Sequence, residues 1–182
     1  FDAHSAPKMG FGKPDWFDQT GREVKHVTDA AGVTDLSGFG KIDLKGADAL
    51  MALQWIASNQ MDRPVESIIY TLMLNDKGGI MSDLTVFRLA DDHFRLYVGT
   101  AALKRDLAWI KQQLKAAWKV TVEDVTETLA TLGLMGQDAN RIADALGASW
   151  MRDIKYFRHA EGSCGGVAVT AGRLSYVGAS GW

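Results

Sequence analysis

The chain has 182 residues, of which 47% are hydrophobic and 23% are charged, and its formal net charge is -2. This composition is close to the average for globular proteins. Without an overall positive charge or a run of roughly 20 apolar residues, neither nucleic acid nor a membrane is expected as a partner. The single cysteine excludes an intrachain disulfide and fits a reducing compartment, the cytoplasm or, in a eukaryote, the mitochondrial matrix.

The first 20 residues hold two of the three prolines and show no hydrophobic period, so we expect residues 1–20 to form an extended lead-in. Residues 21–182 are expected to form one domain. The chain starts with Phe1 and stops inside a strand-like pattern at Gly181-Trp182, so we expect it to be a piece of a longer protein.

Helical and extended patterns alternate along this domain. Short connections join the strands expected at 67–75, 80–89 and 93–99, so these three should be adjacent and antiparallel. The sequence therefore predicts an α+β fold with a largely antiparallel sheet and packed helices. Helices are expected at 21–32, 47–59, 102–118 and 138–147, further strands at 33–37, 41–46, 119–126 and 128–136, and a closing hairpin at 165–178.

Asp83 is the clearest candidate for a functional side chain. It stands in an otherwise apolar strand, where alternation places it on one face with Thr85 and Phe87. A carboxylate on a half-buried strand is costly unless it is hydrogen-bonded or contacts a polar ligand. A site role and a plainer role, on a solvated face or as a cap of the Gly78-Gly79 turn, are both open from this pattern.

Neighbouring strands supply further material for a pocket. Tyr70 combines an aromatic ring with a polar tip, and Asn75 can both donate and accept hydrogen bonds. Arg95 and Tyr97 share one face of their strand, where the arginine either binds a carboxylate or lies at an ordinary surface. The four histidines are far apart in sequence and only one cysteine is present, so no metal site is expected.

Several segments of the chain form a recognisable set: VTDLSGFGKIDLKGADAL, YTLMLNDKGGIMSDLTVFRL, DLAWI, LGLMGQDANRIADAL and RLSYVGASGW. In their order and spacing they resemble the glycine-cleavage T-protein (aminomethyltransferase) folate-binding family. The resemblance runs from about residue 20 to the end. The lead-in GFGKPDWF resembles the entry to the C-terminal folate half of dimethylglycine and sarcosine dehydrogenases.

The resemblance implies a domain that transfers a one-carbon unit from an amine donor to tetrahydrofolate, forming 5,10-methylenetetrahydrofolate. It implies a central folate cavity and a C-terminal β-barrel domain beyond residue 182, with FAD confined to a further domain before Phe1. By the same matching Asp83 is the catalytic residue, near the reacting folate nitrogens. The implied folate-binding residues are Phe39, Tyr70, Asn75, Arg95, Tyr97, Gly99 and Tyr176.

The resemblance leaves several parent proteins open. A dimethylglycine or sarcosine dehydrogenase-like enzyme is favoured by the lead-in. A free-standing aminomethyltransferase, a tetrahydrofolate-dependent demethylase and a degenerate non-catalytic scaffold are the alternatives. A member that aids iron–sulfur cluster assembly is disfavoured because RLSYVG lacks the cysteine of its K-G-C-Y-x-G motif. One position departs from the family pattern: Ala179 stands where a pterin-holding glutamate is usual.

Overall fold

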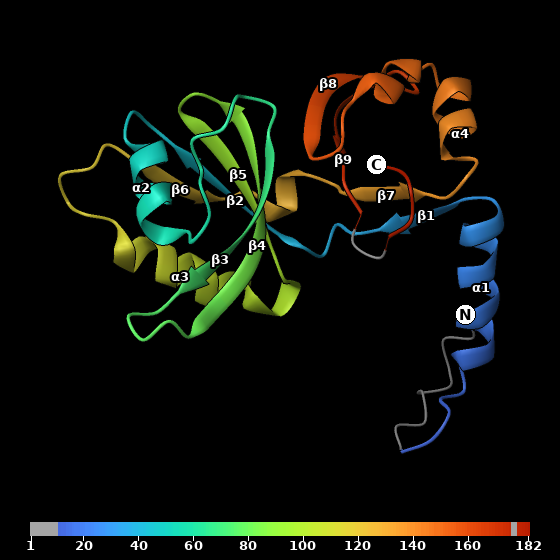
Figure 1. Ribbon diagram of the computed structural model, residues 1–182, viewed down its shortest axis with the longest axis horizontal. Helices are drawn as coiled ribbons and strands as arrows, with labels where there is room; N and C mark the ends of the chain where they lie inside the picture. The colour runs from blue at the N-terminus through green and yellow to red at the C-terminus, as the bar shows by residue number, and fades with distance from the viewer. Residues whose placement is uncertain (1–10, 176–177) are drawn as a thin grey trace.

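The computed structural model describes residues 11–175 and 178–182, and these divide into two lobes (Figure 1). The middle of the chain forms a sheet lobe, whereas segments from both ends combine into a smaller lobe. Each lobe has its own cluster of buried hydrophobic side chains. The α+β class with a largely antiparallel sheet is confirmed.

The sheet lobe is built on five antiparallel strands in the order β3-β4-β5-β2-β6. The first three form the predicted meander, because β3 pairs with β4 and β4 pairs with β5 across short turns. β2 and β6 then extend the sheet from the β5 side. The strands are β2 (Gly40–Lys45), β3 (Ile68–Leu74), β4 (Ile80–Ala90), β5 (His93–Val98) and β6 (Thr121–Asp124).

Helices α2 (Ala49–Ile56) and α3 (Leu103–Gln113) cover one face of this sheet. α2 buries Ala49, Ala52, Leu53 and Ile56, which recur at the spacing of one helix face. Ile110 of α3 is fully buried in the same cluster as the inward side chains of β2, β4 and β5. Each fully buried leucine or isoleucine contributes roughly 1.5–3 kcal/mol to folding, so this face is the main core.

The smaller lobe consists of two two-stranded sheets and short helices. β1 (Gly32–Asp35) pairs with β7 (Leu132–Met135), and β8 (Arg158–Cys164) pairs with β9 (Val167–Arg173), both antiparallel. Its core is small and rich in alanine, and it is closed by Trp182, whose indole N–H donates to the carbonyl of Met151 at 3.0 Å. The helices of this lobe are α1 (Phe17–Asp29), α4 (Ala139–Ala145) and the 3-10 helix η3 (Ser149–Asp153).

The two lobes meet where the β8–β9 hairpin lies against β3 and β4. The amide of Ile68 donates to the carbonyl of Phe157 at 3.0 Å, and the His159 ring stacks on the Phe87 ring at 5.2 Å. A Cβ at Gly172 would come within 2.6 Å of the Phe87 ring, so the close approach of β9 requires glycine there. Backbone pairing, ring stacking and tight packing thus join the lobes.

All four helices differ in length from the sequence prediction. α2 covers 49–56 of the expected 47–59, and α4 covers 139–145 of the expected 138–147. α1 begins at Phe17 rather than at residue 21, so residues 17–20 of the expected lead-in are helical. α3 ends at Gln113 rather than at 118. Beyond this end Lys115 lies over the rings of Trp55 and Trp118, at 4.6 and 5.1 Å from their centroids. The contact between Lys115 and Trp55 joins segments that are far apart in the sequence. The helical period of the sequence therefore did not show where α3 ends.

The closing hairpin is shifted relative to its prediction. Its second strand, β9, lies inside the predicted 165–178 segment, but its first strand is 158–164, with the turn at 165–166. The sequence of β8, RHAEGSC, has few apolar side chains to mark a strand. Residues 176–177 of the predicted segment lie outside the described residues.

Candidate functional site

The sheet has a second face, turned away from α2 and α3, that we call the polar face. Strand pairing aligns Tyr70, Thr85, Tyr97 and Lys41 in one row across the sheet. An adjacent row holds Phe87, Arg95 and Asp43. The sequence predicted the strand face of Asp83 and, separately, the strand face that Arg95 and Tyr97 share. Pairing brings these side chains, together with Tyr70, onto this one face.

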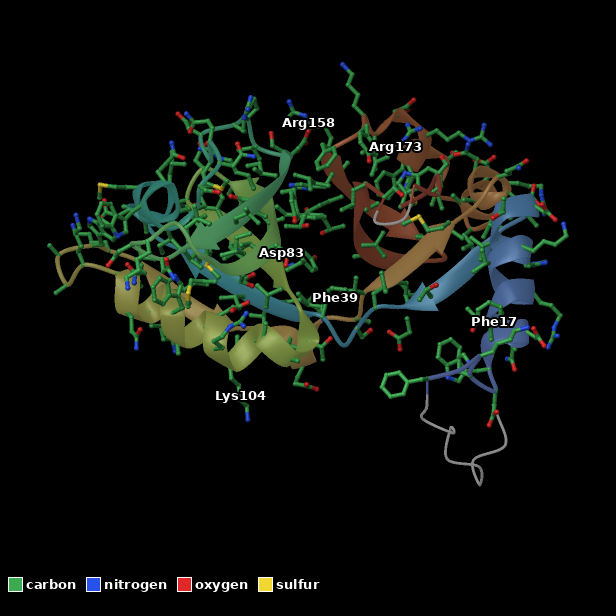
Figure 2. All side chains as sticks on the ribbon, turned by 60° about the horizontal axis from the view of Figure 1, so that its bottom comes forward. Phe17, Phe39, Asp83, Lys104, Arg158 and Arg173 are labelled. Atoms are coloured by element: carbon green, nitrogen blue, oxygen red, sulfur yellow. The ribbon has the colours of Figure 1, made fainter. Side chains whose placement is uncertain are left out.

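Asp83 is exposed on the polar face and accepts a hydrogen bond from the Tyr70 hydroxyl at 3.1 Å (Figure 2 shows its position). It does not cap the neighbouring turn. The Asn75 side chain does so, because its Oδ1 accepts the backbone N–H groups of Lys77 at 3.0 Å and Gly79 at 2.9 Å. Asp83 is therefore an accessible carboxylate held by a phenol, whereas the Asn75 oxygen is already used inside the turn.

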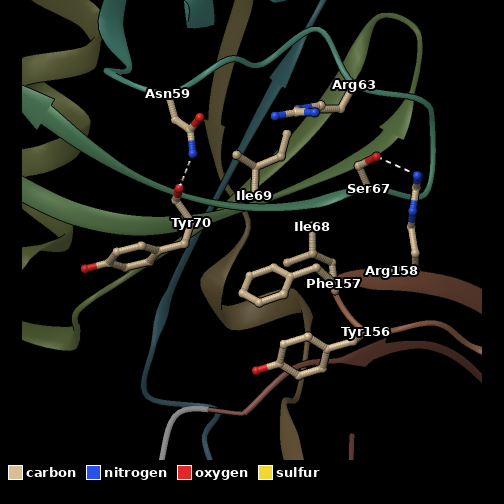
Figure 3. Close-up of a pocket in the computed structure, with 9 residues that line it drawn as sticks. All are labelled: Asn59, Arg63, Ser67, Ile68, Ile69, Tyr70, Tyr156, Phe157 and Arg158. Atoms are coloured by element: carbon tan, nitrogen blue, oxygen red, sulfur yellow. Dashed lines mark hydrogen bonds between the residues drawn. The ribbon is translucent and has the colours of Figure 1, made fainter.

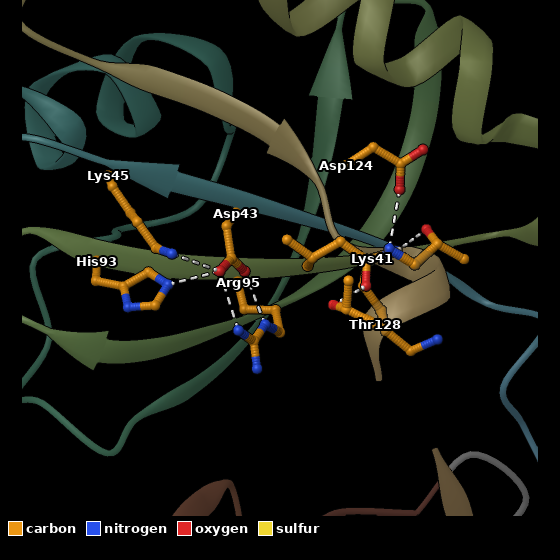
Figure 4. Close-up of polar contacts among 9 residues, drawn as sticks. Lys41, Asp43, Lys45, His93, Arg95, Asp124 and Thr128 are labelled. Carbon is orange, nitrogen blue, oxygen red and sulfur yellow. Dashed lines mark hydrogen bonds and ion pairs between the residues drawn. The ribbon is translucent and has the colours of Figure 1, made fainter. Parts of the chain in front are cut away.

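Arg95 is held by a buried carboxylate from the next strand (Figure 4). Its Nε and Nη2 donate to the two oxygens of Asp43 at 2.7 and 2.9 Å, the paired geometry that arginine and carboxylate favour. His93 Nε2 lies 2.9 Å and Lys45 Nζ 3.2 Å from the same carboxylate. Arg95 therefore binds a carboxylate of its own chain, and only the rest of its guanidinium faces outward.

The pKa values of this cluster reflect burial and charge together. Burial raises the pKa of Asp43, but hydrogen bonds from Arg95 and His93 outweigh it, so the pKa lies below its usual value. Burial acts to lower the pKa of Arg95, but Asp43 raises it further than burial lowers it. Burial raises the pKa of Tyr97, with the charge of Arg95 opposing. At neutral pH Asp43 and Arg95 are both charged, and Tyr97 is a neutral phenol.

Lys41 is a site feature that sequence reasoning missed. Its side chain is fully buried, and Nζ donates to the carbonyls of Ser37 at 2.9 Å and Phe39 at 3.0 Å. Burial lowers the pKa of Lys41. The ammonium fixes the bend before β2 and thereby positions Phe39, whose ring is 37% exposed. The alternation of charged and apolar residues in KIDLK marked a strand face, but it did not show that Lys41 is buried.

Three of the remaining predicted residues lie at the same end of the sheet, where β3 and β5 end and β2 begins. Phe39 precedes β2 and Gly99 follows β5 at the end where Gly40 pairs with Val98. Asn75 lies beyond β3 in the β3–β4 turn. Tyr176 lies outside the described residues.

Neither a metal cluster nor a membrane helix is found in the described parts of the chain. Within residues 11–175 and 178–182, no group of three or more His, Cys, Asp or Glu side chains is placed to hold a metal ion. No helix of these segments is long and apolar enough to cross a membrane. The available chemistry is that of carboxylate, phenol, guanidinium and ammonium groups on a sheet face.

The chain is an α+β domain whose antiparallel sheet has one helix-covered face and one polar face and is joined to a small second lobe. The chain superimposes on the glycine cleavage system aminomethyltransferase T from Bartonella henselae with a TM-score of 0.73 and 21% identity, covering 87% of this chain and 42% of that one. The family described as GCVT N-terminal domain matches residues 2–182, and the chain belongs to that family.

Curated relatives include two kinds of longer protein. The chain is 31% identical to human mitochondrial dimethylglycine dehydrogenase over 178 residues, covering 96% of this chain and 20% of that protein. It is 30% identical to an aminomethyltransferase from a Thermoanaerobacter species over 175 residues, covering 95% of this chain and 47% of that protein. The chain thus spans between a fifth and about half of the length of these relatives.

Proposed function

We propose that this chain is a tetrahydrofolate-binding domain that transfers a one-carbon unit from an amine donor to tetrahydrofolate, forming 5,10-methylenetetrahydrofolate. Membership of the GCVT N-terminal domain family supports this, as do relatives named aminomethyltransferase and dimethylglycine dehydrogenase. When bound, tetrahydrofolate supplies the amine nitrogens that receive the carbon. The protein has to position these nitrogens and manage their charge and protons.

The observation that carries the proposal is the exposed carboxylate of Asp83, held by Tyr70 on the polar face. A carboxylate in this setting can accept a proton from an amine and stabilise a cationic centre that develops beside it. The Tyr70 hydroxyl fixes one carboxylate oxygen by hydrogen bonding. The other oxygen has no hydrogen-bond partner within the described residues and is available to the ligand.

Folate binding is proposed for the residues around Asp83. Phe39, Tyr70 and Tyr97 offer aromatic faces for a flat ring, and Arg95 is held in position by Asp43. Gly99 follows β5, and a Cβ there would have Ala102 Cβ as its nearest neighbour, at 3.9 Å. Asn75 retains its amide N–H groups for a ligand, since its oxygen caps the turn. Tyr176, in the segment 176–177 outside the described residues, completes the proposed set.

The parent protein is proposed to be a longer enzyme of the dimethylglycine or sarcosine dehydrogenase type. The identity to human dimethylglycine dehydrogenase across 96% of the chain supports this. In such a parent, residues 21–182 would be a folate domain between an FAD-binding domain and a C-terminal barrel domain, in the cytoplasm or the mitochondrial matrix. A free-standing aminomethyltransferase is the second candidate, favoured by the comparable identity to the Thermoanaerobacter protein.

The replacement Asp83→Asn in the full gene product tests the proposed role. It keeps the shape of the side chain and its contact with Tyr70, so tetrahydrofolate affinity should stay within a few fold. Loss of a group that manages protons should lower folate-dependent turnover by about two orders of magnitude. Asp76→Asn, which alters an exposed carboxylate in the adjacent turn, is the matched control. Turnover equal to wild type in Asp83→Asn would refute the assignment.

A further inference from the structure

A buried hydrogen bond joins β4 to α3 directly beside Asp83. The hydroxyl of Ser82, the residue before Asp83, donates to Oδ2 of Asp106 at 2.6 Å. Asp106 lies in the first turn of α3, and both side chains of the bond are buried. A distance of 2.6 Å is typical of a hydroxyl bound to an ionised carboxylate. The interior of the sheet lobe therefore contains a strong polar contact one residue away from the proposed catalytic group.

The two oxygens of the Asp106 carboxylate have different partners. Its Oδ1 accepts from Nε of Arg105 at 3.0 Å, and the Arg105 side chain is largely exposed. Because Arg105 neighbours Asp106 on the same helix, this ion pair does not connect the carboxylate to the sheet. Within the described residues, the hydrogen bond from Ser82 makes that connection. Asp106 thus balances its charge at the surface and uses its inner oxygen to hold β4.

The end of β4 that carries Asp83 has little support from the neighbouring strands. β5 pairs with β4 only as far as Leu84 and ends at Val98, so residues 80–83 extend beyond it. On the other side the pairing with β3 skips Met81, which forms a bulge. A bulge leaves one residue unpaired and locally disrupts the ladder of backbone hydrogen bonds. The bond from Ser82 to α3 therefore holds a strand end that the sheet itself holds weakly.

Holding Ser82 also determines the direction of Asp83. Side chains alternate along a strand, and here Ser82 is buried toward α3 whereas Asp83 is exposed on the polar face. A strand end that turned or slid would therefore move both side chains together. The Tyr70 hydroxyl contacts only the tip of the Asp83 side chain, at 3.1 Å. The backbone that carries Asp83 is fixed from the opposite face.

We propose that Asp106, acting through Ser82, is a positioning residue that aims the Asp83 carboxylate at the ligand on the polar face. The inference rests on the proposed function, since Asp83 is the catalytic group that it positions. Displacing a catalytic group by roughly 1 Å lowers a rate by as much as about a hundredfold. Loss of the bond should therefore reduce the rate of the chemical step more than it reduces ligand binding.

The replacement Ser82→Ala in the full gene product tests this inference. It removes the hydroxyl and leaves Asp106 with its ion pair to Arg105. Turnover is followed as formation of 5,10-methylenetetrahydrofolate from dimethylglycine. We expect kcat to fall about tenfold while KM for tetrahydrofolate stays within about twofold, because the groups that bind the ligand keep their places.

Ser67→Ala is the matched control. Ser67 is also a buried serine of the sheet lobe, and its hydroxyl accepts a hydrogen bond from the guanidinium of Arg158 at 2.7 Å (Figure 3). It precedes β3 at the end of the strand opposite to Leu72, which pairs with Asp83. In urea unfolding Ser67→Ala should therefore lose about as much stability as Ser82→Ala, while its kcat stays at the wild-type value.

Two further measurements show whether Ser82 acts through Asp83. The double variant Ser82→Ala/Asp83→Asn should turn over as slowly as Asp83→Asn alone, because the placement of a carboxylate that has been removed has no effect. Hydrogen exchange at the backbone amides of residues 80–84 reports on the strand end without any turnover. This exchange should be faster in Ser82→Ala than in wild type or in Ser67→Ala.

The outcomes separate this inference from the function on which it rests. Unchanged exchange at residues 80–84, unchanged kcat in Ser82→Ala, or losses that multiply in the double variant would each make the bond an ordinary structural contact. The inference then fails while the function stands. If Asp83→Asn turns over as fast as wild type, the proposed function fails and the inference with it. Faster exchange at this strand end, together with a lower kcat at constant KM, supports both.

Discussion

The cluster around Asp43 predicts that Asp43→Asn destabilises the protein strongly. Asp43 is 1% exposed, and its two oxygens accept Arg95 Nε and Nη2 at 2.7 and 2.9 Å. His93 and Lys45 approach the same carboxylate. Asparagine keeps the shape but removes the charge and one acceptor. The Arg95 guanidinium, whose side chain is only 15% exposed, would then lack its counter-charge.

The size of the effect follows from how far the partners are shielded from water. Breaking a buried ion pair from one side costs roughly 3–5 kcal/mol. Arg95, His93 and Lys45 are 15%, 23% and 46% exposed, so water recovers part of the loss. We therefore expect about 3 kcal/mol, which for a chain of this length lowers the melting temperature by roughly 6–12 °C.

Urea unfolding followed by tryptophan fluorescence measures this, because Trp109 packs against the core of the sheet lobe. The pKa of Asp43 in the folded protein lies below its usual value, so its contribution is complete above the unfolded pKa of about 3.9. The contribution is lost as the pH falls through the lower folded pKa. The difference between wild type and Asp43→Asn should therefore be full at pH 7 and shrink below about pH 4.

Asp91→Asn provides the comparison, because Asp91 is 92% exposed and lies 3.6 Å from Arg88 at the surface. Its unfolding midpoint should stay close to that of wild type. An Asp43→Asn midpoint equal to that of Asp91→Asn, or a difference from wild type that does not depend on pH, would show that the cluster is not held by its charge.

Two further predictions concern the lobe junction and the family's pterin position. Burial lowers the pKa of His159, so the folded protein favours the neutral ring. Stability should therefore be complete above pH about 6.5 and fall as the pH drops toward the folded pKa. His159→Gln should flatten this dependence in urea unfolding between pH 7.5 and 5.5, whereas His26→Gln, which alters a ring on α1, should keep the wild-type slope. Ala179→Glu should tighten tetrahydrofolate binding in calorimetry, since a carboxylate accepting pterin N–H groups contributes roughly 1.5–3 kcal/mol, or tenfold for each 1.4 kcal/mol. Unchanged affinity would place the pterin elsewhere.

Local patterns predicted the sheet meander and the buried helix faces because their information is short-range. Alternation and tight turns specify β3, β4 and β5, and the apolar stripe of α3 points to the core that Ile110 enters. β8 was missed because it carries few apolar side chains and depends on its partner β9 and on contacts at the lobe junction. A strand held mainly by tertiary contacts leaves a weak pattern in its own residues.

The candidate site likewise combines features that local patterns predict with features that depend on tertiary contacts. Alternation placed Arg95 and Tyr97 on one strand face, and this is how they lie. That Arg95 is bound by Asp43 depends on the pairing of β2 with β5, whose residues are 52 positions apart in this contact. A one-residue change of register would turn every side chain of β2 to the other face, placing Ile42 and Leu44 outside and Lys41 and Asp43 in the core. The burial of Ile42 and Leu44 therefore selects the register, and the register in turn supplies Arg95 with its carboxylate. The polar face is thus positioned by the apolar one, and substitutions in the core at Ile42 or Leu44 should disturb the site before they abolish the fold.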